Sequence, residues 1–537
     1  MFERRIKRFV CFVFLVAIVI QNQEVAFAQA PSYSREAVAD RERNVESEGI
    51  VRKDDRLKSR IGNDMLMQGQ QSIGNAKNNV RGSGGRGGQS AMLRFDQHRD
   101  VTPPAHSTVS LGSWYTDIGI GQSIGVQYIR MEGDGVGYNT ENGRGQYLED
   151  GFDIPLVSTL YLNNYVVISR RIDLSFNINV SYAYYPFETQ EDTLDVNMSD
   201  EGVFATFSSE FELSRDLRLL AYDDILYKTD YIDTRGMEDV YGGEEYEHLE
   251  NTIGADLDWK LTNHDNISLS GSRKDVISFD EEFDDQEGVF YSEFLSYQRE
   301  LTRFAVAGIY GTSEQSLYDL DTRENVNIYG MGIFASAQLT RKLYGTASAG
   351  YNFSVYPDSD DDTRNGSFAG SLGLGHQISE EKYQSLYYDR SQREAFRGGV
   401  DVTDTLRYMY NWDSGILPGS FTTRYSIYTP TDDRGSYADW DASFDVRYQL
   451  TRRWNLDFNT SYTIRWNDQG EDDLEVDSPY ITSDYATWVI RLGTSRPITK
   501  KTRFVMYVEH ADRTSDNDDL VYTQDSIVAT FDWTHKF

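Results

Sequence analysis

The feature of this sequence that most constrains its fold is an alternation of apolar and polar residues that recurs from about residue 118 onward. Between residues 437 and 450, apolar side chains from Ala438 to Leu450 fill every second position, and polar residues such as Asp439 and Arg447 fill the others. Successive side chains of a β-strand point to opposite faces, whereas a helix would mix these two sets. The alternation therefore predicts strands with one apolar and one water-facing side.

Short turns join these segments in pairs and share one sequence pattern. An aliphatic residue is followed by Ser or Thr and usually by a charged residue, at Leu213-Ser214-Arg215, Leu261-Thr262, Leu301-Thr302-Arg303, Leu339-Thr340-Arg341, Ile378-Ser379-Glu380, Leu450-Thr451-Arg452 and Ile498-Thr499-Lys500. Most of these turns follow one another after roughly 38–48 residues, which indicates an internal repeat of one hairpin and one long loop.

The other ends of the strands are joined by longer stretches rich in acidic residues, Gly and Asn, at 132–155, 187–200, 229–248, 279–287, 357–365, 467–483 and 514–521. Short turns at one end and long loops at the other are typical of outer-membrane barrels. The segments from 118–131 to 522–537, with 201–213 as the fourth, number about 20, with a range of about 18–22. We therefore predict an all-β fold, a transmembrane antiparallel up-and-down β-barrel with long extracellular loops and short periplasmic turns.

Composition excludes several other classes. The 52 basic residues stand against 86 acidic ones, and a net charge of −34 repels phosphate backbones, so we expect no nucleic-acid partner. A mean hydropathy of −0.57 argues against a bundle of membrane helices. The aromatic content of 13% is too high for a disordered acidic chain.

The N-terminus has the three parts of a Sec-type export signal. Basic residues Arg4 to Arg8 precede an apolar run from Phe9 to Ile20, and Ala26-Phe27-Ala28 forms a small-residue cleavage site. We predict a cleaved signal peptide over 1–28; an uncleaved anchor is the alternative. The single cysteine, Cys11, lies inside this segment, so the mature chain would have no disulfide or thiol chemistry.

Two further regions follow the predicted signal peptide. Residues 29–117 include the low-complexity run 82–88 and are predicted to form a flexible periplasmic segment, and residues 118–537 are predicted to form the barrel. Basic residues between 41 and 60 could contact peptidoglycan or a partner, although interleaved acidic residues favour a solvated stretch.

The last strand ends in an aromatic residue. Phe537, Trp533 and Phe531 fall on one face when the chain is counted back by twos. This pattern resembles the C-terminal β-signal of bacterial outer-membrane proteins, which implies recognition by the barrel assembly machinery. His535 departs from the usual apolar residue at its position.

The run from Leu450 to Phe458 and its counterparts resemble the outer-membrane β-barrel porin families, over roughly residues 118–537. Some members of these families accompany exopolysaccharide export systems. The resemblance implies a barrel in the outer membrane of a Gram-negative-type bacterium, in contact with lipid and lipopolysaccharide. It supplies no catalytic motif.

Catalytic and metal-binding patterns are sparse. The seven histidines form no metal-spaced pair, and Glu509 and His510 would face opposite sides of a strand, so we expect neither an enzyme nor a cofactor. The acidic loop residues Asp358, Asp360, Asp361 and Asp362 are a weak candidate calcium or magnesium site. The alternative is a solvated loop that bridges divalent ions to lipopolysaccharide.

The water-facing side of the strands is the remaining functional surface. Its charged residues are predicted to line the barrel interior at Asp173, Asp256, Asp258, Lys260, Arg407, Arg424, Asp439, Asp441, Asp445, Arg447, Asp457, Arg465, Arg491 and Asp532. Opposed charge rows would favour small polar solutes over apolar ones. Equally, these charges could serve only to neutralise each other across a wet wall.

These patterns favour a porin-like channel for passive diffusion of small hydrophilic solutes or ions, with a weak cation preference at its acidic mouth. Residues 29–105 are too low in complexity for a folded plug, so we expect no active transport. One alternative is an export duct for an exopolysaccharide, along whose tyrosines a sugar chain could slide. Another is a structural or adhesive barrel, which inward folding of loops 132–155 or 229–248 would favour. A soluble lectin-like protein is a distant fourth hypothesis.

Overall fold

The chain divides into two compact units, Met1–Ile61 and Gly62–Phe537. In the computed structural model all described residues belong to the second unit, and they are 109–133, 138–139, 144–145, 151–169, 172–187, 193–197, 207–231, 245–279, 286–318, 323–357, 364–394, 399–431, 436–451, 453–467, 484–499, 501–515 and 521–536. The predicted signal peptide and most of the predicted periplasmic segment lie outside these residues.

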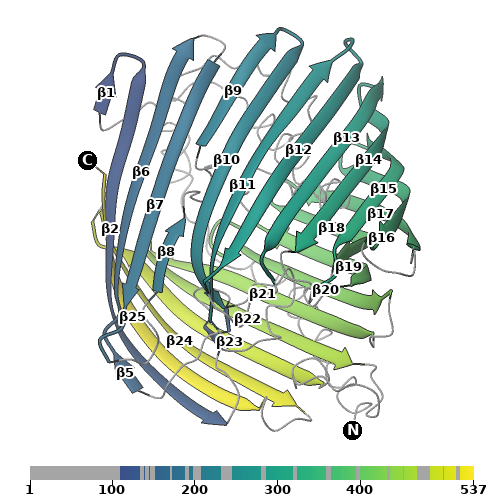
Figure 1. Ribbon diagram of the computed structural model, residues 1–537. Coiled ribbons are helices and arrows are strands. Elements are labelled where there is room, and N and C mark those ends of the chain that lie inside the picture. Colours follow the sequence, from purple (N-terminus) through teal and green to yellow (C-terminus); the bar gives the residue numbers. More distant parts are fainter. Residues whose placement is uncertain are drawn as a thin grey trace. The chain divides into compact units, whose positions relative to one another are not determined.

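The described residues form strands throughout (Figure 1). In the N-terminal half these are β1 (Val109–Leu111), β2 (Trp114–Gly133), β3 (Tyr138–Asn139), β4 (Arg144–Gly145), β5 (Gly151–Asp153), β6 (Leu156–Ser169), β7 (Ile172–Tyr184), β8 (Thr193–Asn197), β9 (Phe207–Ser214), β10 (Leu217–Tyr231), β11 (Glu245–Lys260), β12 (Asp265–Ser278) and β13 (Gly288–Thr302). The remaining strands are β14 (Ala305–Tyr318), β15 (Val326–Gln338), β16 (Leu343–Val355), β17 (Arg364–Ser379), β18 (Lys382–Glu394), β19 (Val400–Trp412), β20 (Gly419–Pro430), β21 (Tyr437–Thr451), β22 (Trp454–Asn467), β23 (Tyr485–Pro497), β24 (Thr502–Ser515) and β25 (Tyr522–Lys536). In the described part of the chain, no helix is long and apolar enough to cross a membrane.

The sheet closes on itself. Each wall strand pairs antiparallel with its neighbours in sequence, and β2 pairs with β6 on one side and with the last strand, β25, on the other. The register at the closure runs from Gly119 opposite Lys536 to Gly133 opposite Tyr522. Counting β9 as the fourth position, the wall has 20 strands. Both the predicted fold class and the predicted strand number are confirmed.

One strand position differs from the prediction. β8 and β9 share the place between β7 and β10: Asn197 of β8 lies opposite Asn179, and Phe207 of β9 lies opposite Phe176. The predicted loop 187–200 therefore contains a strand, and the described part of the predicted strand 201–213 begins at Phe207. Acidic residues in 187–200 indicated a loop, whereas the short alternation of Leu194 and Val196 was enough to extend the ladder on β7.

The start of the barrel also differs from the sequence expectation. The first wall strand begins at Trp114, before the expected residue 118, and β1 pairs back onto it with Leu111 opposite Trp114. Gly112 makes this tight turn with a φ of 64°, a conformation that glycine adopts without steric cost.

The recurring turn sequence has a direct structural cause. At six turns the Ser or Thr hydroxyl accepts a hydrogen bond from the backbone N–H two residues later, with distances of 3.0–3.3 Å; the six acceptors are Ser214, Thr262, Thr302, Thr340, Thr451 and Thr499. Such a side-chain bond stabilises a tight turn locally. The repeat seen in the sequence is therefore a repeat of turn chemistry.

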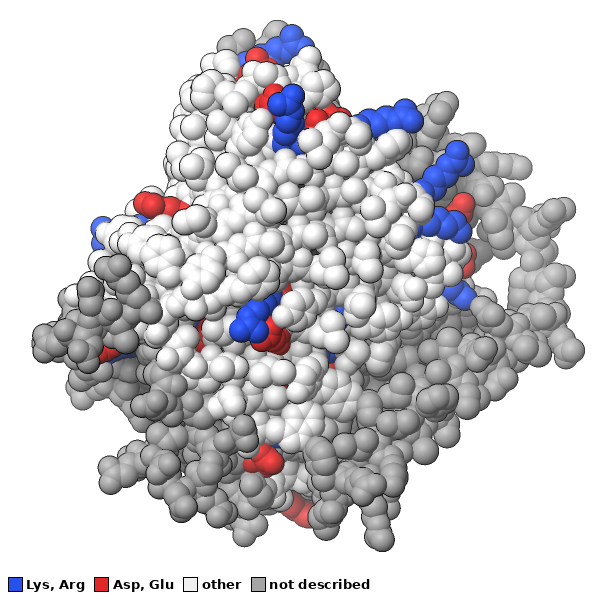
Figure 2. All heavy atoms as spheres, turned by 90° about the vertical axis from the view of Figure 1, so that its right-hand side faces the viewer, with Lys and Arg blue, Asp and Glu red and all other residues white. Residues whose placement is uncertain are grey.

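The two faces of the wall differ as the alternation predicts. Every second residue of a wall strand faces outward, and large apolar side chains are exposed at these positions, among them Ile309, Met331, Ile333, Phe368, Leu372 and Leu492. The outer face in Figure 2 is mostly uncharged. Where charges occur outside, they are often paired, as in the 2.7 Å contact between Arg390 and Asp404.

All eight tryptophans lie at outward positions. Five are near the short-turn ends of their strands, and three are nearer the long loops; the two groups are Trp114, Trp259, Trp412, Trp454 and Trp533, and Trp440, Trp466 and Trp488. Trp454 and Trp466 on β22 are separated by about 30 Å along the barrel axis, given the usual strand rise and tilt. Two aromatic rows that flank an apolar band are typical of a membrane-spanning barrel.

Candidate functional site

The predicted interior residues lie on inward-facing strand positions, on two groups of strands. Asp256, Asp258 and Lys260 lie on β11, Asp173 on β7 and Asp532 on β25. The other nine are gathered on the neighbouring strands β19–β23, and we call them the charged wall: Arg407, Arg424, Asp439, Asp441, Asp445, Arg447, Asp457, Arg465 and Arg491.

The residues outside the charged wall make separate local contacts. The Ser268 hydroxyl donates to the Asp258 carboxylate at 2.7 Å, and the Ser123 hydroxyl donates to Asp532 at 2.8 Å. The backbone of Asp173 lies opposite Val167 on β6 and Glu210 on β9. These positions are not brought together into one site.

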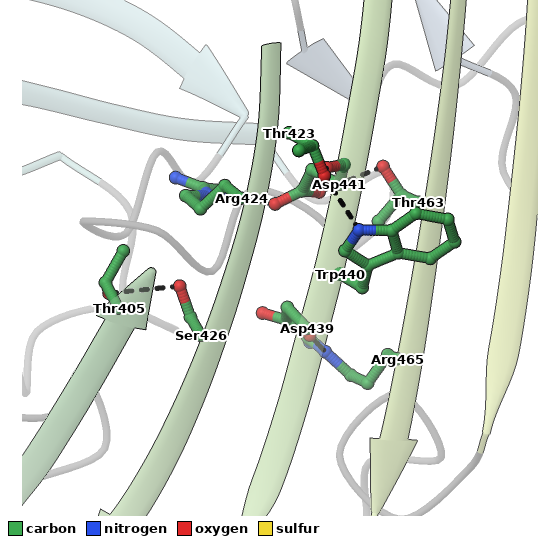
Figure 3. A network of polar contacts seen from close by, with 9 residues as sticks. All are labelled: Thr405, Thr423, Arg424, Ser426, Asp439, Trp440, Asp441, Thr463 and Arg465. Carbon is green, nitrogen blue, oxygen red and sulfur yellow. Dashed lines mark hydrogen bonds and ion pairs between the residues drawn. The ribbon is translucent and has the colours of Figure 1, made fainter. Parts of the chain in front are cut away.

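Within the charged wall, side chains of opposite charge on neighbouring strands pair with one another (Figure 3). Arg465 on β22 donates two hydrogen bonds to Asp439 on β21, at 2.7 and 3.0 Å. Arg424 on β20 contacts Asp441 at 2.8 Å, and the Thr463 hydroxyl donates to the same carboxylate at 3.1 Å. The cross-strand register places these side chains in direct opposition, so the pairing follows from the fold.

The charged wall changes in exposure along the barrel axis. The Arg465 and Asp439 side chains are only 5% and 6% exposed. Nearer the short turns, Arg447 contacts Asp457 at 2.6 Å, and their side chains are 58% and 35% exposed. Buried, doubly bonded ion pairs depend strongly on both partners, whereas exposed pairs are screened by water. The long-loop end of this wall is therefore held by a buried ion pair, and the short-turn end is exposed to water.

A row of alternating rings and guanidinium groups crosses the long-loop end of the same wall. Tyr428 stacks on Tyr437 with ring centroids 4.3 Å apart, and Arg465 lies 5.1 Å from the Tyr437 ring and 5.4 Å from that of Tyr485. Arg513 continues the row, 4.8 Å from Tyr485 and 5.0 Å from Tyr522. Cation–π contacts of this kind link strands β20–β25 by their side chains as well as by their backbones.

A pocket of about 470 Å³ lies in the wall near the short turns. Its polar lining comes from four strands: Ser420, Asp445, Arg447, Asp457, Asn459 and Arg491. Asn459 and Ser420 hydrogen-bond Asp445, and Arg491 lies 3.5 Å from the Tyr507 ring centroid. Donors, acceptors and both signs of charge thus converge on one water-accessible hollow.

Arg407 differs from the other basic residues of the charged wall. It lies directly opposite Arg424 on the neighbouring strand, and Arg424 is already paired with Asp441. Among the described residues, no carboxylate lies within ion-pair distance of Arg407. Of these two adjacent guanidinium groups only Arg424 is paired with a carboxylate, which leaves a local positive charge at Arg407.

On β15–β17 the inner face is different in kind. Midway along these strands its side chains are small and uncharged, between larger ones such as Ile328 and Phe334 on β15, and we call these positions the small-residue wall: Gly330, Gly332, Ser348, Gly350, Ala369, Ser371 and Gly373. Tyr310 from β14 lies across it, because a Cβ on Gly332 would come within 2.6 Å of the Tyr310 hydroxyl. The Tyr310 side chain therefore fills part of the space above these small residues.

The remaining candidates give a mixed outcome. Trp533 and Phe531 lie exposed on the outer face of β25, and Phe537 is outside the described residues. The candidate metal loop Asp358, Asp360, Asp361 and Asp362 also lies outside them. Within the described part of the chain, no group of three or more His, Cys, Asp or Glu side chains could hold a metal ion.

Two groups of interior residues were not predicted individually. Tyrosines were expected in the interior, but Tyr428, Tyr437, Tyr485 and Tyr522 were not singled out, because tyrosine occurs on both faces of these strands. Gln392, Glu394 and Val400, which contact the inner face of distant strands, were also missed. The alternation gave no indication of this for Val400 and Val402, because both are in phase with the outward-facing Leu406 and would be placed on the outer face.

No family model matches the chain, and no curated protein matches it. Several solved structures resemble it. The FrpB iron transporter of Neisseria meningitidis (F5-1 variant) has a TM-score of 0.45 at 9% identity, covering 78% of this chain and 82% of that one. OpdL of Pseudomonas aeruginosa has 0.36 at 9%, covering 79% and 99%. A loop-deletion mutant of OmpT, an outer membrane protein of Vibrio cholerae, has 0.32 at 9%, covering 78% and 100%. The similarity concerns barrel architecture alone, and it says nothing of the function of this chain.

Proposed function

We propose that the protein is an outer-membrane channel for passive diffusion of small hydrophilic solutes or ions. The charged wall carries this proposal: a membrane-spanning barrel keeps Arg447, Asp457 and their neighbours part-exposed on its inner face, beside a polar pocket of about 470 Å³. Partly solvated charges inside a barrel suit a water-filled path. The predicted signal peptide and the C-terminal aromatic pattern support export and insertion by the barrel assembly machinery, with lipopolysaccharide as the outer neighbour.

The channel would select by charge and width rather than by a tight binding site. Most charged-wall residues are balanced by a partner on the next strand, so the wall offers hydrogen bonds to a passing solute without holding an ion strongly. We infer a weak overall cation preference from the acidic long loops, opposed locally by Arg407. We propose no catalytic step and no cofactor.

Single-channel conductance of the refolded full chain in a planar bilayer tests the proposal. A steady open current with modest cation preference is the expected result. A well-folded barrel that gives no current under any voltage, and no swelling of liposomes in small sugars or amino acids, would contradict it.

A second candidate is an export duct for an exopolysaccharide. It is favoured by an interior tyrosine that lies over a glycine, since a Cβ on Gly119 would come within 1.8 Å of the Tyr161 ring. A partly exposed ring on the inner wall offers an apolar face to a sugar ring. Loss of surface polymer on deletion of the gene, with unchanged uptake of small solutes, would favour this candidate over the first.

A further inference from the structure

The long-loop end of the β18–β19 hairpin separates from its neighbour in the wall. β17 runs from Arg364 to Ser379, but it pairs with β18 only between Gly370 and Ser379. Arg390 is the last residue of β18 that pairs with β17. β18 continues beyond it as far as Glu394, and it stays paired with β19 up to the Glu394–Val400 pair. The last four residues of β18 are therefore held by β19 alone among the wall strands.

The side chains show which way the hairpin turns. Leu386 and Tyr388 are exposed on the outer face, and Gln392 and Glu394 continue the same side of the strand. Both of the latter are buried, and Gln392 donates to the hydroxyl of Ser354, an inner-face residue of β16, at 3.1 Å. The side of β18 that faces outward at Leu386 and Tyr388 thus faces the inner surface of other strands at Gln392 and Glu394. The hairpin end lies inside the barrel.

Glu394 fixes this end to strands that are distant in the wall. Its carboxylate accepts hydrogen bonds from Ser316 and Tyr318 of β14, four strands away, and from Arg323 at 3.1 Å. The side chains of Arg323 and Glu394 are almost fully buried, and the Arg323 guanidinium also lies 4.0 Å from the Tyr318 ring centroid. A buried carboxylate with three partners is costly to release, so this cluster can act as a latch.

An apolar cluster supports the same position. Val400, the first residue of β19, is 0% exposed and packs with Val326 and Ile328 on the inner face of β15 and with Tyr356 after β16. On its other side the hairpin remains part of the wall, since β19 stays paired with β20 up to the Asp401–Pro430 pair. The hairpin end thus joins β20 to the inner faces of β14–β16.

We propose that this inward end of the β18–β19 hairpin is the constriction that sets the size of solute admitted, and that Glu394 is the latch that holds it. The inference rests on the proposed channel function. It makes Glu394, Arg323 and Val400 determinants of exclusion size, although none of them belongs to the charged wall.

The test combines a chemical reporter with conductance. In a Cys11→Ser background, Val400→Cys supplies the only thiol of the full chain, and its rate of reaction with a water-soluble maleimide reports release of the hairpin. We expect slow labelling with the native latch and about tenfold faster labelling when Glu394→Ala is added, because local opening exposes the buried thiol. Glu381→Ala, an exposed glutamate at the short-turn end of the same strand pair, is the matched control.

The same latch substitutions, made without the reporter, should raise single-channel conductance and admit larger sugars in liposome swelling. Val326→Ala loosens the apolar cluster without leaving Arg323 unpaired, and it should act in the same direction if Glu394→Ala prevents folding. Unchanged labelling in both variants would overturn the latch, and faster labelling with unchanged conductance in a conducting protein would overturn the constriction. Faster labelling in a barrel that never conducts would instead contradict the proposed channel function.

Discussion

The small-residue wall on β15–β17 and the charged wall on β19–β23 have nearly the same outer surface and opposite inner ones. Outside, Ile333 on β15 and Leu492 on β23 are 61% and 55% exposed, each five positions from the short-turn end of its strand. Inside, one side presents glycine, alanine and serine midway along its strands, and the other presents paired charges to the interior. The membrane therefore dictates only the outer face of each strand, and the inner face can differ from one part of the wall to another.

The largest expected effect separates the two ends of the charged wall. Arg465→Met leaves Asp439 buried without its partner, and we expect a loss of about 3–5 kcal/mol in unfolding free energy. Arg447→Met breaks an exposed pair and should cost less than about 1 kcal/mol. Denaturant unfolding of each variant in detergent micelles measures the difference.

The double variant Asp439→Leu/Arg465→Met is the control for the buried pair. Because it removes both charges, it should recover most of the stability lost by Arg465→Met alone. Equal losses in the Arg465 and Arg447 variants would mean that burial does not distinguish the two ends of the charged wall.

The next prediction concerns what the two walls share. Ile333→Arg and Leu492→Arg each place a charge near the middle of the apolar band, and each should cost about 2–4 kcal/mol. The two losses should be equal within error, since the outer environments match. Refolding into lipid vesicles under denaturant titration gives both values, and a clear inequality would show that the inner faces also influence the lipid-facing side.

Part of this structure was predictable from the sequence alone. Strand number and most strand bounds were predictable, because lipid imposes alternation on every wall strand and the Ser/Thr turns mark their ends. Opposed pairs such as Arg424 and Asp441 follow from register, which the turn positions fix. The position of Glu394 was not predictable, because its partners lie four strands away and depend on where the hairpin departs from β17. Likewise, β8 contributes only five paired residues within an acidic segment.

A smaller effect concerns the hydrogen bonds that outward-facing tryptophans of β21 and β23 donate next to lipid. The Trp440 indole donates to the Thr423 hydroxyl at 2.8 Å, and that hydroxyl donates to the Asp441 carbonyl at 3.0 Å. Trp488 and Thr460 repeat the arrangement at 3.0 and 2.9 Å. Thr423→Val should cost about 1–2 kcal/mol, because the indole N–H then lacks an acceptor beside lipid. Thr423→Ser, which keeps the hydroxyl, should restore the stability in the same unfolding assay, and a destabilised Ser variant would assign the effect to packing instead.

The smallest expected effect is on the selectivity between cations and anions. Its measurement tests whether solutes pass along the charged wall. Arg407 lies opposite Arg424, and no carboxylate among the described residues pairs with it, so its charge should attract anions locally. Arg407→Gln should therefore raise the cation-to-anion permeability ratio by about twofold at low salt, and less at high salt, where screening is stronger. Reversal potentials under a salt gradient measure this ratio. Arg341→Gln removes the same charge from the exposed turn between β15 and β16 and should leave the ratio unchanged. If both variants shift the ratio equally, the charge acts through the field of the whole barrel, and the charged wall has no privileged place on the solute's path.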